Sequence, residues 1–213
     1  MDLTTWLIYV SVTSILIFTP GPSALLCISD GLKYGKKRSV ATVLGGATAA
    51  MILMSISAAG LGVILVASEK LFFILKNLGA VYLIYIGLQS WRHTGSIAQF
   101  RAEQPTEQID IAWLTLFKKG FMVGISNPKD LLFFIALFPG FIDTSSPHVE
   151  QYVILALTWF ILDCSFMFMY SVIGNKCSRW LFNHKNMRRF NRVVGAIFIS
   201  LGSTLAITSG ASR

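Results

Sequence analysis

The chain has 213 residues, of which 54% are hydrophobic and 13% are charged, and its mean hydropathy is +0.64. Soluble proteins carry about 25% charged residues, so this composition excludes an ordinary soluble domain and indicates an integral protein of a lipid bilayer. The net charge is +8, but the basic residues are spread over segments between apolar runs, which argues against nucleic-acid binding.

Six apolar runs approach or exceed the roughly 20 residues that a membrane-spanning helix needs. Only Asp2, and no Lys or Arg, precedes the first run, which therefore lacks the basic start of a secretory signal peptide. We predict an all-α membrane protein whose six transmembrane helices form one translocator domain over residues 1–213. The runs lie at 3–19, 40–67, 71–91, 120–142, 150–174 and 193–208.

A polar stretch at about 93–111 separates the first three predicted spans from the last three. An odd number of spans in each half means that the halves insert in opposite directions, as in an inverted repeat. We therefore predict a 3+3 arrangement, with repeat 1 at about 1–92 and repeat 2 at about 112–213.

The distribution of basic residues predicts the orientation. Of the 18 Lys and Arg residues, 14 lie in the segments between spans 1 and 2, spans 3 and 4, and spans 5 and 6. Segments rich in Lys and Arg stay in the cytoplasm, so both termini are expected on the outer side of the membrane.

Two short breaks interrupt the first and fourth spans, and both contain proline. Proline removes a backbone donor, so a break at membrane depth is tolerated only against protein or a wet cavity. Two such breaks, one in each half, indicate a transporter binding site. The residues of this predicted substrate site are Pro20, Gly21, Pro22, Ser23, Asn127, Pro128 and Lys129.

Each break is predicted to be the end of one helix followed by the start of another. Asn127 is a strong N-cap type, and Pro128 suits the first helical position. A half-helix that begins inside the membrane directs free N–H groups and a positive dipole end at what lies ahead, where a carboxylate is a natural ligand. The alternative is a structural kink that binds nothing. Lys129 could receive a substrate carboxylate, or neutralise Asp130 or Asp163.

Asp163 is an acid in the middle of the uninterrupted fifth span. Its insertion costs roughly 2.5–3.5 kcal/mol, so it should face the interior with a partner. It is either a functional group, as a proton carrier or an ammonium counter-ion, or a structural one, as a partner of Lys129 or a hydrogen-bonded neutral acid. Tyr170, seven residues on, shares its helix face and is a candidate partner. Asp30, at the end of span 1, is the second candidate for proton coupling; it is either a gate residue or part of a solvated loop.

No predicted span contains histidine, and no nucleophile or metal motif is present, so we predict neither a catalytic residue nor a cofactor or metal site. Cys27, Cys164 and Cys177 fit no zinc spacing and are expected to be small core residues. The second span is rich in small residues, including Gly45, Gly46 and Ala49, which allow close helix packing within the subunit or between subunits of a homo-oligomer.

An ordered set of motifs covers nearly the whole chain and resembles the LysE/RhtB superfamily of amino-acid exporters, most closely its homoserine, homoserine lactone and threonine efflux branch. Asp163 and Tyr170 match an acid and a tyrosine in the fifth span of that branch, whereas Gly140 and Asp130 depart from its usual residues. The motifs are Pro20-Gly21-Pro22, the loop from Gly31 to Lys36, the run from Leu78 to Gly87, Asn127-Pro128-Lys129 with Leu132-Phe133-Phe134, and the run from Leu137 to Ile142.

The resemblance implies a transporter of the bacterial inner membrane, with periplasmic termini, that exports small neutral amino acids or their derivatives by proton antiport. A second hypothesis is a cation exporter of the same superfamily, in which Asp163, Cys164 and Cys27 would be the ligands. One acid and two thiols without histidines make a poor metal site.

Overall fold

The computed structural model describes residues 1–67, 111–143 and 146–173, together with scattered helical positions between 77 and 91 and between 188 and 203. These residues form helices joined by short turns, with no strand among them, so the predicted all-α class is confirmed. The predicted spans at 71–91 and 193–208 and the linker at 93–111 lie largely outside the described residues, as does Cys177.

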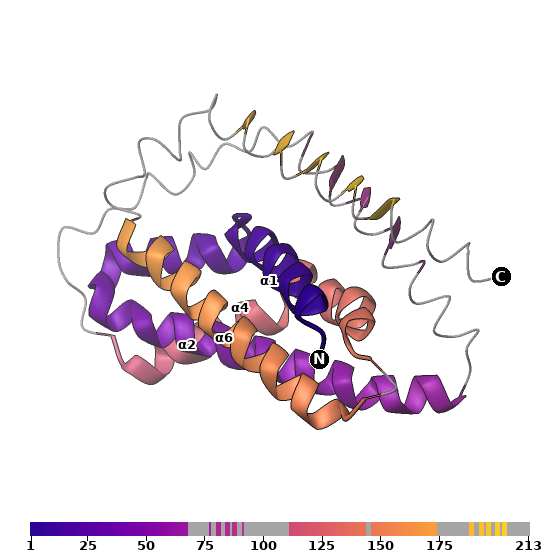
Figure 1. Ribbon diagram of the computed structural model, residues 1–213. Coiled ribbons are helices and arrows are strands. Elements are labelled where there is room, and N and C mark those ends of the chain that lie inside the picture. Colours follow the sequence, from indigo (N-terminus) through magenta and orange to yellow (C-terminus); the bar gives the residue numbers. More distant parts are fainter. Residues whose placement is uncertain are drawn as a thin grey trace.

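The first described segment, residues 1–67, contains α1 (Leu3–Phe18) and the long α2 (Pro22–Ala67), shown in Figure 1. Asp2 caps α1 by accepting hydrogen bonds from the first backbone N–H groups of that helix. Gly35 interrupts α2 with φ of 76°, a conformation that glycine adopts without strain, and the helix turns back there. The predicted loop between spans 1 and 2 is therefore a tight turn between two helical arms.

The second half follows the same alternation of helix and break. A long helix, α4, is followed by the one-turn α5 and then by a π-helical and a 3₁₀ segment before the chain reaches α6. Asn127 caps α5 by accepting from the Lys129 N–H, and Pro128 is its first residue, as the sequence predicts. The bounds are α4 (Trp113–Ile125), α5 (Pro128–Leu132), η2 (Phe133–Leu137), η3 (Phe138–Phe141) and α6 (His148–Ile173).

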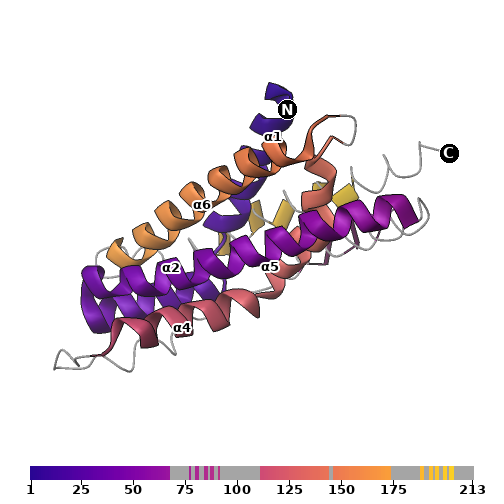
Figure 2. The ribbon, with the colours of Figure 1, turned by 90° about the horizontal axis from the view of Figure 1, so that it is seen from below.

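Helix α2 lies between α4 and α6 and packs on both (Figure 2). The contact with α4 is a close backbone approach that requires glycine. A Cβ atom added at Gly45 would lie 2.1 Å from the Phe117 carbonyl oxygen, and one added at Gly120 would lie 2.1 Å from the Thr42 carbonyl oxygen. These small residues therefore pack helices within the subunit.

Helix α6 is apolar on both faces but buries only one. The outward face includes Leu157 and Ile161, which are 58% and 62% exposed. Such a face suits contact with lipid acyl chains rather than water. Among the described residues, Pro22–Gly60 and His148–Val172 are long and apolar enough to cross a membrane. The buried face contains Leu155, Trp159, Asp163, Met167 and Tyr170.

Candidate functional site

The first break separates α1 from α2. The Thr19 N–H donates to the Ile15 and Leu16 carbonyls at 3.1 and 3.2 Å, and this closes the last turn of α1. The helix cannot continue regularly because Pro20 and Pro22 have no N–H to donate. The break therefore leaves the carbonyl groups at the end of α1 in need of other donors.

Lys129, in the second break, supplies those donors. Its Nζ atom donates to the Leu16 carbonyl at 2.8 Å and to the Thr19 carbonyl at 3.0 Å. Asn127 makes a further link, since its Nδ2 donates to the Ser23 hydroxyl at 3.2 Å. The structure thus brings together two breaks that lie more than 100 residues apart in the sequence.

The backbone of the first break at Gly21 lies next to the Lys129 ammonium. A Cβ atom added at Gly21 would lie 3.6 Å from Lys129 Nζ, which is ordinary contact distance. The ammonium lies beside the start of α2 as well as the end of α1. The predicted binding residues therefore form one spatial group, with Lys129 at the contact between the two breaks.

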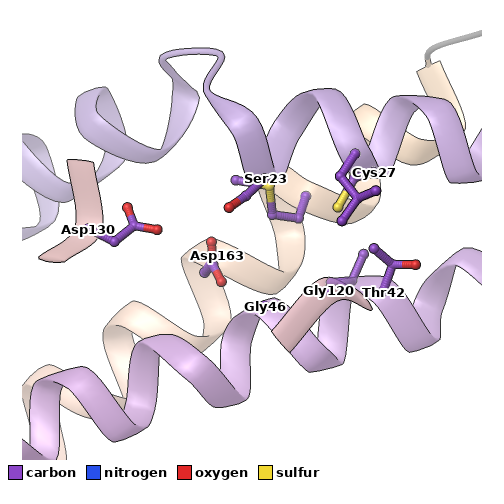
Figure 3. A pocket seen from close by; sticks show the side chains of 10 residues that line it. Ser23, Cys27, Thr42, Gly46, Gly120, Asp130 and Asp163 are labelled. Atoms are coloured by element: carbon purple, nitrogen blue, oxygen red, sulfur yellow. The ribbon is translucent and has the colours of Figure 1, made fainter. Parts of the chain in front are cut away.

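A cavity opens next to this group, between both arms of α2, α4, α5 and α6 (Figure 3). It is narrow, with room for about one water molecule in this conformation, so a larger ligand requires the surrounding helices to move apart. Its wall combines hydroxyl, carboxyl, thiol and apolar groups. The lining residues are Ser23, Leu26, Cys27, Thr42, Val43, Gly46, Gly120, Asp130, Asp163 and Met167.

Two acids line this cavity, and their surroundings differ. Asp130 accepts a hydrogen bond from Asn127 Nδ2 at 2.7 Å, within the first turn of α5. Asp163 is only 8% exposed, yet its carboxyl group has no hydrogen bond or ion pair with any described residue. A buried carboxyl group without a partner is costly unless a proton or a cation satisfies it. The Asp163 side chain points into the cavity (Figure 3).

Asp30 lies one turn beyond Cys27 on the first arm of α2, and it is fully buried. Lys119 Nζ on α4 donates to Asp30 Oδ1 at 2.6 Å, and the Thr42 hydroxyl donates to Asp30 Oδ2 at 2.8 Å. The solvated-loop interpretation of Asp30 does not hold, because the residue is helical and enclosed. Lys119, which sequence reasoning assigned only to a basic segment, is its partner.

Tyr170 occupies the buried face of α6, as its spacing from Asp163 predicts. Its hydroxyl group donates to the Phe18 carbonyl at 2.5 Å, and this hydrogen bond links α6 to the end of α1. Cys27 is buried in the cavity wall and Cys164 is half-buried. No group of three or more His, Cys, Asp or Glu side chains in the described part of the chain is arranged to hold a metal ion.

Comparison with known proteins gives a consistent result over most of the chain. The family model described as LysE type translocator matches residues 14–209. A homoserine/homoserine lactone efflux protein of Salmonella typhimurium is 32% identical over 201 residues, which cover 94% of this chain and 95% of that protein.

Two further relatives are described only as uncharacterized membrane proteins. The one from Vibrio cholerae is 30% identical over 209 residues, covering 97% of this chain and 98% of its own length. The one from Bacillus subtilis is 28% identical over 200 residues, covering 92% and 95%. No solved structure matches the chain.

Proposed function

The chain belongs to the LysE type translocator family, and from this premise we propose that it exports small neutral amino acids or their derivatives across the bacterial inner membrane by proton antiport. A member of this family is a membrane transporter and not an enzyme. The substrates proposed are homoserine, homoserine lactone, threonine or similar compounds, in line with the efflux protein of Salmonella typhimurium.

The observation that carries the proposal is the buried Asp163 carboxyl group inside the cavity, which has no hydrogen bond or ion pair with a described residue. An amino acid brings an ammonium group, which would satisfy this carboxylate when substrate is bound. A proton would satisfy it when the site is empty. Alternation between these two partners would couple the export of substrate to the entry of a proton.

The substrate carboxylate would bind at the broken helices. Helices α2 and α5 both begin near the cavity, with their positive dipole ends toward it. Pro22 and Pro128 have no N–H and the Lys129 N–H is capped by Asn127, so the N–H groups that follow in the first turns would bind the carboxylate. A lysine ammonium has three donors, of which Lys129 uses two for the carbonyls of Leu16 and Thr19. The third can reach a carboxylate placed between the two breaks.

Asp30 is the second candidate for proton coupling. It already has hydrogen bonds from Lys119 and Thr42, whereas Asp163 has no hydrogen bond or ion pair among the described residues. This difference favours Asp163 as the group that exchanges a proton for a substrate ammonium. Asp30 would take that role if neutral variants of Asp163 retained coupled export.

The membrane arrangement that we propose has six spans in a 3+3 inverted repeat, with α1 and the first arm of α2 as one broken span and α4 to η3 as another. The meeting of the two breaks supports this arrangement, because broken spans from the two halves of a transporter enclose its binding site. Both termini would then lie in the periplasm.

Reporter fusions test this topology. A reporter that is active only outside the cytoplasm is expected to be active when fused to the C-terminus, because 14 of the 18 basic residues lie in segments assigned to the cytoplasm. A fusion within residues 93–111 serves as the control and should be inactive. An active cytoplasmic reporter at the C-terminus would contradict the six-span arrangement.

Transport itself is tested with vesicles loaded with radiolabelled homoserine or threonine. Efflux is expected to accelerate when a pH gradient drives protons inward, and to slow when an ionophore abolishes that gradient. Empty vesicles without the protein give the background rate. Efflux that does not respond to the gradient would remove proton antiport from the proposal, and efflux at the background rate would remove the substrates.

A further inference from the structure

Gly46 has no packing reason to be glycine, unlike its neighbours on the α2–α4 contact. Added Cβ atoms at Gly45 and Gly120 would come within 2.1 Å of backbone oxygens, and one at Gly124 would come within 2.9 Å of the Ala49 side chain. A Cβ atom at Gly46 would meet only the Gly120 carbonyl oxygen, at the comfortable distance of 3.9 Å. Glycine within a helix costs about 1 kcal/mol relative to alanine, so its presence here calls for another explanation.

The position of Gly46 supplies that explanation, because the residue lines the cavity. Figure 3 shows Asp130 and Asp163 toward one end of the cavity and Gly120 and Thr42 toward the other, with Gly46 between them. The acids can satisfy only the charged part of a substrate. The part of the substrate that extends away from the acids must therefore run along Gly46.

We propose that Gly46 determines the size of the substrate side chain that the transporter accepts. This inference rests on the proposed export of amino acids and adds to it the residue that selects among them. The ammonium group binds at Asp163, and the side chain occupies the space left by the missing Cβ atom of Gly46. The buried Asp163 carboxyl group, which has no hydrogen bond or ion pair within the described part of the chain, is the independent sign that a charged ligand enters this cavity.

The test compares homoserine with serine, which differ by one methylene group. In Gly46→Ala the rate of homoserine export relative to serine export is expected to fall about tenfold, because a pocket distinguishes one methylene by roughly that factor. Gly46→Val should lower the ratio further. Both rates are measured with radiolabelled amino acids, at concentrations below saturation, in vesicles that contain equal amounts of protein.

Gly60→Ala is the matched control, since it lies on α2, is outside the cavity wall and has nothing within 4 Å of an added Cβ atom. It should leave the ratio unchanged. An unchanged ratio in Gly46→Ala, or an equal loss of export for both amino acids, would overturn the role of Gly46. The thermal denaturation temperature of purified Gly46→Ala is expected to match or exceed that of the parent protein, because no atom obstructs the new methyl group.

A binding measurement separates this inference from the proposed function. Homoserine and serine are each added to the purified protein, and the stabilisation against heat is recorded. If the parent protein binds both but exports neither, export is overturned, and the binding ratio in Gly46→Ala still decides the role of Gly46. If neither amino acid stabilises the parent protein, both proposals are overturned.

Discussion

Export driven by a pH gradient is expected to collapse in Asp163→Asn, while exchange of internal for external substrate continues. The amide keeps the size of the carboxyl group but cannot bind and release a proton. The Asp163 carboxyl group has no hydrogen bond or ion pair with a described residue, so the substitution breaks no such contact there. A neutral group is also cheaper than a carboxylate inside a membrane, and the variant should therefore insert and fold normally.

The same vesicles provide both measurements. Net efflux is followed after a pH jump, and exchange is followed at equal pH with labelled substrate inside and unlabelled substrate outside. Asp163→Glu, which restores an ionisable group, should recover part of the gradient-driven rate. If Asp163 has only a structural role, Asp163→Asn should export at the parental rate. Its thermal stability should then equal or exceed that of the parent protein. Intact gradient-driven export in that variant would contradict the mechanism and direct attention to Asp30.

Local signals in the sequence were sufficient for the helix ends around the second break. Asn127 and Pro128 act on the backbone within one turn, and the structure shows the cap and first position that their chemistry predicts. The buried position of Asp163 follows from the same kind of reasoning, because a charged group in an apolar helix turns toward the interior. These features depend on the residue and its immediate neighbours.

The contacts that join distant segments were beyond sequence reasoning. Nothing near Lys129 indicates that its ammonium binds the carbonyls of Leu16 and Thr19, since that contact depends on how the two breaks meet. The turn at Gly35 was expected as a loop, because the surrounding basic residues are typical of one. Helices continue to within one residue of this turn because glycine alone supplies the required φ of 76°.

The pairing of Asp30 with Lys119 is the clearest of these distant contacts, and it leads to a prediction about stability. Lys119→Met should lower the temperature of thermal denaturation more than Asp30→Asn does. The first variant leaves a fully buried carboxylate with Thr42 as its remaining partner among the contacts described. The second replaces that carboxylate with a neutral amide, whose oxygen can accept from Lys119 while its NH₂ group donates to the Thr42 hydroxyl oxygen. Breaking a buried ion pair costs about 3–5 kcal/mol, and the cost is smaller here because the Lys119 side chain is 43% exposed.

The double variant Asp30→Asn, Lys119→Met shows whether the two residues stabilise the protein as an ion pair or independently of each other. If the pair is the reason for the loss, the double variant should be more stable than Lys119→Met alone, since the second substitution removes the unpaired charge. Two independent residues would instead give a double variant less stable than either single variant. Thermal denaturation of the four purified proteins, with Lys118→Met as a control for loss of a neighbouring lysine, decides between these orders. Gradient-driven export should persist in Asp30→Asn, because the pair joins α2 to α4 and Asp163 carries the proton.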